Sequence, residues 1–433
     1  MSIAGFPLEQ LLILPIAVVA FIVLLTIIVF FHEYGHFSAA RALGIRVDVF
    51  SIGFGRPIAR WTDRKGTEWR ISMLPLGGYV KFFGDASGAS NPKADIAGEI
   101  EDAAADDSAE PSTEDRARPA TTQFPRPGEA DGLASRLTPE ERAVCFHFKP
   151  VWARAIVVAA GPMANFILAT AIFWVLLISF GSYVVTPKVG EVVEDSAAAE
   201  AGFVAGDLIV SVNGRKIARF DELTMTTRLS SGEELRFEVE RDGERLTLYA
   251  TPRRQEIDDA FGNVAEAGVL GIVGDASSVT FVRYAPLDAL KEASRQVWRV
   301  ISGTLRFLSR LVVGKEDTRQ LGGPIKMAQY AGQSAMSGFE GDDISFLDRL
   351  KVSLGNFINL AAVVSVSIGF LNLLPVPVLD GGHLLYYAYE GIAGRPLGAR
   401  AQAIGFQLGM VLLASFMIFV TWNDIANLLS LLG

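Results

Sequence analysis

Four long stretches without a charged side chain limit what this chain can fold into more than any other feature. They cover residues 11–31, 155–179, 352–379 and 401–423. A helix needs about 20 consecutive apolar residues to cross the hydrocarbon core of a bilayer. A buried helix of a soluble protein rarely runs so far without a charge. We therefore expect four transmembrane helices.

Composition agrees with a membrane protein, since half of the 433 residues are hydrophobic and only 20% are charged. The formal charge of −9 comes without a basic stripe, which excludes the electrostatic pattern of a nucleic-acid-binding protein. Cys145 is the only cysteine, so the chain forms no internal disulfide and no thiolate zinc site. The first apolar stretch lacks the basic start of a signal peptide, and we expect it to be retained.

Lysine and arginine near the ends of the four stretches predict the orientation. Loops 32–154 and 380–400 carry eight such residues within twenty positions of a stretch, whereas loop 180–351 carries three. The positive-inside rule places the first two loops in the cytoplasm, and the third loop and both termini on the opposite side. Residues 85–145 are rich in Ala, Asp, Glu, Ser and Pro, which predicts a disordered acidic cytoplasmic insert.

The end of the first stretch carries a metal-binding pattern. His32, Glu33 and His36 form H-E-x-x-H, which on a helix places the two imidazoles one turn apart on the same face. Two such imidazoles can share a zinc ion, and Glu33 lies where it can take a proton from a water that the metal activates. Ionisable groups at a bilayer boundary are costly, so we interpret this pattern as functional rather than as a solvated helix face.

Catalytic zinc sites commonly use three protein ligands, so a third must come from elsewhere. The end of the third stretch contains two prolines and two glycines, which exclude a regular helix over residues 372–383. Irregular backbone at membrane depth is tolerated where it lines a cavity. We expect Asp380, within this break, to be the third ligand, although it could also be a turn residue or a helix N-cap. His383 is the rival ligand.

These motifs together resemble one protein family. His32 to His36 and Leu379-Asp380-Gly381 are similar to the signatures of the site-two proteases, which are intramembrane zinc metalloproteases. Further segments resemble the bacterial regulator-of-sigma-E protease branch of that family: Phe50-Ser51-Ile52-Gly53-Phe54-Gly55, Pro75-Leu76-Gly77-Gly78-Tyr79-Val80-Lys81, Gly161-Pro162-Met163-Ala164-Asn165 and Leu321-Gly322-Gly323-Pro324-Ile325.

The resemblance implies roles for individual residues. It implies that zinc is held by His32, His36 and Asp380 and that Glu33 is the catalytic base. Asn165 and Asn372 are similar to polar residues that the family places near its active site and its substrate; on their own, they could equally well join helix to helix.

The resemblance also implies the setting: an enzyme of the bacterial inner membrane that takes part in regulated intramembrane proteolysis. Its substrates would be transmembrane proteins, such as an anti-sigma factor that an upstream site-one type protease has already trimmed, or a remnant signal peptide.

Residues 68–82 predict a hairpin beside the metal helix, because apolar and polar residues alternate around a turn at residues 75–78. A helical substrate must be unwound before its peptide carbonyl can react, and a strand edge could hold the opened segment by β-addition. The resemblance implies that this hairpin is membrane-associated. An ordinary cytoplasmic hairpin is the alternative.

Residues 186–254 contain short strand runs divided by turns such as Asn213-Gly214 and Asp242-Gly243, and predict a small β-rich domain. The segments 196–207 and 209–214 resemble a bacterial PDZ domain. Such a domain could bind a peptide end, or it could be a steric cover that excludes bulky substrates. Residues 286–313 have apolar side chains along one helical face, which indicates an amphipathic helix on the outer membrane surface or a core helix of this domain.

The predicted fold is therefore an α-helical integral membrane protein with four transmembrane helices, a membrane-associated β-hairpin and an inserted PDZ domain. We expect these segments in order: 1–84 with the first helix and the hairpin, the insert 85–145, the second helix in 146–182, the PDZ domain in 183–255, a linker with the amphipathic helix in 256–350, and the last two helices in 351–433.

Two other functions fit parts of the sequence less well. A prenyl-protein type metalloprotease also has H-E-x-x-H but takes a glutamate as third ligand. A PDZ-bearing scaffold with a structural metal would not need Glu33, because a structural site has no use for a base.

Overall fold

The computed structural model describes residues 2–3, 6–83, 137–258, 264–315, 318–339 and 345–430. The chain divides into two compact units, one built from residues 8–169 and 360–419 and the other from residues 1–7, 170–359 and 420–433. Most of the predicted insert 85–145 lies outside the described residues. Its end forms a short helix, α4 (Pro139–Val144), whose N-terminus is closed by a capping box between Thr138 and Glu141.

Within the described residues, four helices are long and apolar enough to cross a membrane, as predicted. They are α1 (Leu8–Ala42), α5 (Val151–Phe180), α10 (Phe346–Asn372) and α12 (Ala399–Ser430). Helix α1 continues past the H-E-x-x-H residues, which therefore lie within its candidate span Pro15–Ala42. The chain is a multi-pass membrane protein.

The break after the third span is shorter than predicted. Helix α10 ends at Asn372, and an irregular segment leads to α11 (Asp380–Ala393). The prediction that the glycines exclude a helix was wrong at this point, because Gly381 and Gly382 belong to the first turn of α11. Their lack of a side chain has a local reason: a Cβ on Gly381 would lie 2.2 Å from the carbonyl oxygen of Leu374, so the irregular segment folds tightly against α11.

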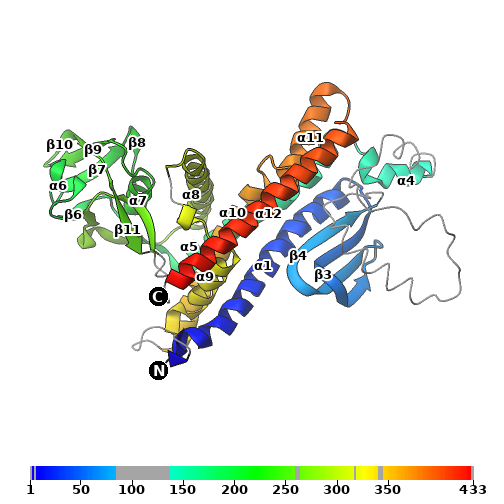
Figure 1. Cartoon of the computed structure of the whole chain (residues 1–433), viewed down its shortest axis with the longest axis horizontal. Coiled ribbons are helices and arrows are strands. Elements are labelled where there is room, and N and C mark those ends of the chain that lie inside the picture. The colour runs from blue at the N-terminus through cyan, green and yellow to red at the C-terminus, as the bar shows by residue number, and fades with distance from the viewer. Residues whose placement is uncertain are drawn as a thin grey trace. The chain divides into compact units, whose positions relative to one another are not determined.

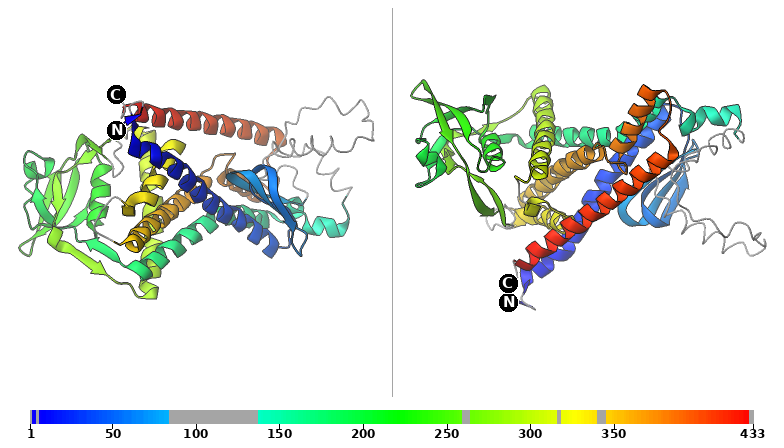
Figure 2. Two further views of the ribbon diagram at one scale, coloured as in Figure 1. Left: turned by 90° about the horizontal axis from the view of Figure 1, so that it is seen from below. Right: turned by 45° about the horizontal axis from the view of Figure 1, so that its top comes forward.

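The first unit also contains a β-ribbon that packs beside α1 (Figures 1 and 2). It consists of β3 (Val47–Thr62) and β4 (Glu68–Phe82), with a turn between them. Residues 49–52 pair with residues 68–71 on one side and with residues 78–81 on the other. The segment 68–71 pairs in addition with residues 59–62. The predicted hairpin was wrong in its pairing: within the described residues its two arms pair with residues 49–52 and not with each other, because residues 49–52 lie between them. The segment 78–82 forms one outer edge of the ribbon.

An aromatic core joins this ribbon to the end of α1. Phe37 of α1, Phe50 of β3 and Phe82 of β4 are buried in one cluster with Phe146 of the short helix η2 (Phe146–Phe148). The rings of Phe37 and Phe50 meet edge to face at a centroid distance of 5.3 Å. This packing fixes the ribbon against the helical turns that carry His32 and His36.

The second unit contains the predicted β-rich domain. Its four-stranded sheet has the order β10-β9-β7-β8, and three further pairs in the described residues join β13 to β6, β14 to β5 and β11 to β12. The strands are β5 (Ser182–Val185), β6 (Val189–Val192), β7 (Leu208–Val212), β8 (Arg215–Lys216), β9 (Leu235–Arg241), β10 (Glu244–Ala250), β11 (Arg253–Asp258), β12 (Val264–Val269), β13 (Ile272–Gly274) and β14 (Val279–Val282). The helices are α6 (Ala197–Glu200) and α7 (Phe220–Arg228), with a 3-10 turn η3 (Ala276–Ser278).

The turns of this domain form where the sequence predicts them. Asn213 and Gly214 both have positive φ angles, 49° and 76°, as do Asp242 and Gly243 with 51° and 86°. Two successive positive φ values match the twist of a tight antiparallel hairpin. The buried core includes Phe203, Phe237 and also Leu270, which lies beyond the segment that the strand pattern indicates.

Helix α8 (Pro286–Val312) forms where an amphipathic helix is predicted. Leu287, Leu305 and Val312 are exposed along one side, whereas Glu292 and Val297 are buried. The remaining elements are β1 (Ser2–Ile3), β2 (Phe6–Pro7), η4 (Thr318–Gln320), α9 (Pro324–Met336) and η5 (Ser337–Phe339).

Candidate metal centre

Helix α1 brings the two histidines together. His32 and His36 stand one turn apart, are 8% and 4% exposed, and have their Nε2 atoms 3.3 Å apart. The Nδ1–H of His36 donates to the carbonyl oxygen of Val157 on α5 at 2.9 Å. A carbonyl can only accept, so Nδ1 carries a proton, and Nε2 presents its electron pair when the ring is neutral.

Asp380, at the start of α11, completes the cluster. Its Oδ2 atom lies 3.1 Å from Nε2 of His32 and 3.6 Å from Nε2 of His36. The residue is 9% exposed, and Oδ2 has no conventional hydrogen-bond partner within the described residues. The irregular segment after α10 therefore delivers Asp380 to the face of α1 that carries both imidazoles.

These three side chains fit a zinc ion. Their ligand atoms all lie within 4.8 Å of one another, and two imidazole nitrogens with one carboxylate oxygen form a donor set that catalytic zinc sites use. Buried electron-pair donors that face one another repel unless a proton or a cation lies between them. The cluster of His32, His36 and Asp380 could therefore bind a metal. His383 is not part of it within the described residues.

Two glycines make room for the centre. A Cβ on Gly161 of α5 would lie 2.2 Å from Nε2 of His36, and a Cβ on Gly35 would lie 2.2 Å from the carbonyl oxygen of Ala160. Small residues let transmembrane helices approach closely. Helices α1 and α5 therefore pack backbone to backbone here, with Gly161 directly beside a candidate ligand.

Asn165 supports His32 from α5. It is fully buried, and its side-chain amide lies 3.2 Å from Nδ1 of His32. Its carbonyl oxygen Oδ1 has no hydrogen-bond partner within the described residues, whereas its main-chain oxygen accepts from the hydroxyl of Ser365 at 3.0 Å. If the side-chain amide of Asn165 is flipped, its Oδ1 accepts a hydrogen bond from Nδ1–H of His32. Nε2 of His32 is then free to bind a metal.

Glu33 lies between the metal cluster and the ribbon. Its Oε2 is buried without a hydrogen-bond partner within the described residues. A Cβ on Gly78 would lie 3.0 Å from Cγ of Glu33 and 2.8 Å from the carbonyl oxygen of Ser51. The outer edge of β4 therefore passes directly beside the side chain of the residue that the sequence marks as the base.

The other two candidate residues are placed differently. Asn372 is the last residue of α10, and His383 lies one turn into α11, where its ring stands edge to face near Tyr386. The structure thus brings five of the candidates to one place: His32, Glu33, His36, Asn165 and Asp380. Within the described part of the chain, Asn372 makes no hydrogen bond to this group.

Sequence reasoning missed the supporting contacts of Val157, Gly161 and Gly78. The contact of Val157 is made by its main-chain carbonyl, so the residue type gives no indication of it. The two glycines stand in segments that resemble site-two protease signatures, and a glycine in such a segment is a signal for close backbone approach.

Comparison with known proteins places the chain among peptidases. The pattern of peptidase family M50 matches residues 20–416. A protein of Agrobacterium fabrum that carries the name zinc metalloprotease is 42% identical over 414 residues, which cover 95% of this chain and 96% of the relative. Metalloprotease MmpA of Caulobacter vibrioides is 40% identical over 410 residues, with 95% of each chain covered. A protein of Rhizobium meliloti, also named as a zinc metalloprotease, is 41% identical over 407 residues, with 94% and 95% covered.

Proposed function

Because this chain belongs to peptidase family M50 and is a membrane-embedded zinc metalloprotease, we propose that it is an endopeptidase that cleaves other membrane proteins within their membrane-spanning segments. One observation carries this proposal. His32, Glu33 and His36 lie inside the candidate span Pro15–Ala42, where a site for soluble substrates has no reason to be.

The candidate residues divide the work of peptide hydrolysis. His32, His36 and Asp380 hold the zinc. When bound, the metal polarises the peptide carbonyl and lowers the pKa of water to about 7. Glu33 takes the proton of the attacking water and returns it to the leaving amine. Asn165 orients His32, and a contact with the substrate is what the family resemblance implies for it. Asn372 contacts the substrate at the end of α10.

The edge of the ribbon would hold the unwound substrate. Residues 68–71 are paired on both sides, so they offer no open edge. Within the described residues, the segment 78–82 has a strand partner on one side alone, and Gly78 stands beside Glu33. A substrate segment that adds to this edge would present its main chain next to the base, with strand hydrogen bonds replacing those of the helix.

The proposed setting follows the sequence signals. The distribution of lysine and arginine supports an active site toward the cytoplasmic side of a bacterial inner membrane, with the β-rich domain on the outer side. The substrates would be single-span proteins in regulated intramembrane proteolysis, such as an anti-sigma factor trimmed by an upstream site-one type protease, or a remnant signal peptide.

We assign the β-rich domain to the PDZ type and propose that it excludes substrates with bulky outer parts. The segment 196–214 supports the assignment, since helix α6, strand β7 and the Asn213-Gly214 turn follow in the order of the resemblance. Binding of a peptide end is the alternative role. Deletion of the domain separates the two, because exclusion predicts cleavage of untrimmed substrates and peptide binding predicts slower cleavage of trimmed ones.

The experiment that tests the proposed function uses purified protein and a single-span substrate in liposomes. The parent should produce fragments whose masses place the cut within the span, and Glu33→Gln should keep its zinc and lose cleavage. Met163→Ala is a matched control, since Met163 lies on α5 near the centre but is 47% exposed. Cleavage restricted to loops outside the span, or full activity of Glu33→Gln, would contradict the proposal.

A further inference from the structure

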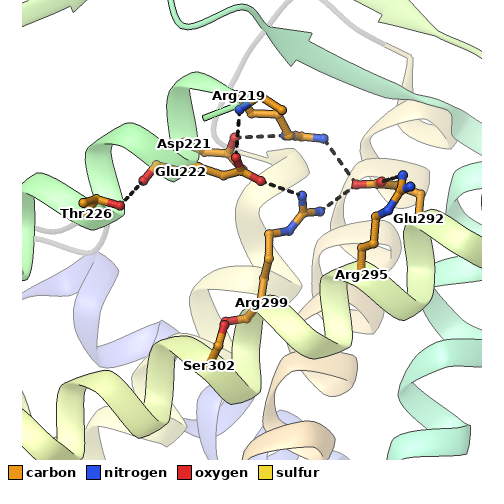
Figure 3. A network of polar contacts seen from close by, with 9 residues as sticks. Arg219, Asp221, Glu222, Thr226, Glu292, Arg295, Arg299 and Ser302 are labelled. Carbon is orange, nitrogen blue, oxygen red and sulfur yellow. Dashed lines mark hydrogen bonds and ion pairs between the residues drawn. The ribbon is translucent and has the colours of Figure 1, made fainter. Parts of the chain in front are cut away.

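A network of charged side chains joins the β-rich domain to α8 (Figure 3). Glu292 of α8 lies 2.7 Å from Arg299 and 3.7 Å from Arg219, which precedes α7. Arg299 also reaches Glu222 of α7 at 3.6 Å, and Arg219 is held by Asp221 at 2.9 Å. Glu292 is thus the carboxylate that both arginines share across the junction.

The network is balanced in charge, and its centre is shielded from water, whereas Asp221 and Arg295 at its rim are exposed. It contains three acidic residues, Asp221, Glu222 and Glu292, and three basic ones, because Arg295 also pairs with Glu292 at 3.4 Å. The side chain of Glu292 is 9% exposed, against 17% for Arg219 and 24% for Arg299. Removing one charge from such a group leaves the others uncompensated, which costs far more than losing an exposed surface pair.

Two more contacts lie along the same side of α8. A Cβ on Gly303 would lie 2.1 Å from Cε of Met225, so the methionine of α7 fills a notch in the helix. Arg310 pairs with Glu233 at 2.9 Å. The four α8 residues in these contacts follow one another at intervals of seven, four and seven positions, which places them on the same side of a helix. They therefore form one stripe that faces the domain: residues 292, 299, 303 and 310.

Between these contacts the junction is hollow. A cavity of about 760 Å³ opens between α7, β5 and α8, with Tyr183, Phe220, Met225 and Phe307 among its lining residues. A continuous apolar interface would hold the domain by close packing, but a hollow one cannot. The charges around Glu292 therefore carry a large share of the attachment.

Helix α8 is in turn fastened to a membrane helix. The indole N–H of Trp174 on α5 donates to the carbonyl oxygen of Pro286, the first residue of α8, at 2.8 Å. The opposite side of α8 exposes Leu287, Leu305 and Val312. A domain that is fixed on α8 is thus fixed with respect to this end of α5.

We propose that Glu292 is the positioning residue of a charge clamp that holds the β-rich domain on α8 and thereby sets the size of the substrates that the enzyme admits. The evidence for the clamp is the pair of contacts that Glu292 makes with Arg219 and Arg299. The size limit rests on the proposed function, in which the β-rich domain excludes substrates with bulky outer parts. Loss of the clamp frees the domain to move and admits substrates that still carry their outer part.

The first measurement is the distance distribution between two spin labels in the full-length protein. Labels at Thr247 of β10 and Ser294 of α8 are both on exposed residues, and the native Cys145 is buried. The parent and Lys291→Gln should give one narrow distance, because Lys291 pairs with Asp288 on the exposed side of α8. Glu292→Gln should give a broad distribution.

The second measurement is cleavage of a matched pair of substrates, with and without a folded outer part. Glu292→Gln should cleave the untrimmed substrate about tenfold faster than the parent does, a factor expected from the loss of one hydrogen-bonded charge. Cleavage of the trimmed substrate should be unchanged. Arg219→Gln tests the same contact from the domain side if Glu292→Gln does not fold.

The distance distributions test the clamp, and the cleavage rates test the size limit that we propose for it. Narrow distances in both Glu292→Gln and Arg219→Gln would overturn the clamp, whatever the cleavage rates. Broad distances with no cleavage of the untrimmed substrate would support the clamp and refute the size limit. Broad distances in Lys291→Gln as well would overturn the assignment to Glu292.

Discussion

Replacing Gly161 with alanine is the smallest change that should disable the metal centre. The added Cβ would lie 2.2 Å from Nε2 of His36, whereas ordinary contacts begin at 3.4 Å, so the ring must move by about 1.2 Å. The ring cannot swing toward solvent, because His36 is 4% exposed and its Nδ1–H is held by Val157. Zinc sites tolerate ligand displacements of about 0.2 Å.

Whether Gly161→Ala stabilises or disrupts the site depends on the steric clash with His36 and not on helix propensity. Alanine favours a helix interior by up to about 1 kcal/mol over glycine, so Gly161→Ala would stabilise α5 if there were room. A misplacement of about 1 Å costs on the order of 100-fold in rate, and a perturbed ligand costs about 10- to 100-fold in metal affinity. We expect losses of this size in both quantities.

The assay is zinc affinity by competition with a chelator, together with cleavage of a single-span substrate. Gly355→Ala on α10 is the matched control, since no atom lies within 4 Å of a Cβ at that position. Its zinc affinity and activity should equal those of the parent. Parent-like zinc affinity and cleavage in Gly161→Ala would refute the geometry of His36 described above.

Three further changes test other parts of the structure. Asn165→Leu should lower zinc affinity about 10- to 100-fold, whereas Asn165→Asp, which keeps an acceptor for Nδ1–H of His32, should lower it less, as chelator competition would show. Gly78→Pro should slow cleavage without changing zinc content, because proline removes a main-chain donor and adds bulk beside Glu33. Asp63 is expected to stabilise the ribbon: although burial acts the other way, hydrogen bonds from Trp69 and neighbouring main-chain groups lower its pKa to about 2. About 2 kcal/mol of stability should therefore be present above pH 4 and lost as the pH falls toward 2, with no such loss in Asp63→Asn, as monitored by tryptophan fluorescence.

The local parts of the site could be predicted from the sequence. The spacing of His32 and His36 alone places both rings on one helix face, and the prolines after Asn372 mark the break that brings Asp380 to them. Contacts between distant segments could not be predicted in this way. No pattern near Asn165 says that it meets His32, 133 positions away.

The β-ribbon and the charge clamp also depend on contacts between distant segments, which the sequence does not predict. Alternation around residues 68–74 indicates a strand, but which edge stays open depends on a second pairing with residues 49–52. The apolar face of α8 was visible in its periodicity. Its polar side was not, because the partners of Glu292 and Arg299 come from α7 and the residue before it, about 70 residues earlier in the chain.

We propose above that His32, His36 and Asp380 hold one zinc ion within the membrane part of the chain. The most direct test is the zinc content of purified Asp380→Ala and His383→Ala, measured against the parent by mass spectrometry. We expect Asp380→Ala to lose zinc and His383→Ala to keep one zinc per chain. Full zinc occupancy in Asp380→Ala together with loss of zinc in His383→Ala would contradict this set of ligands.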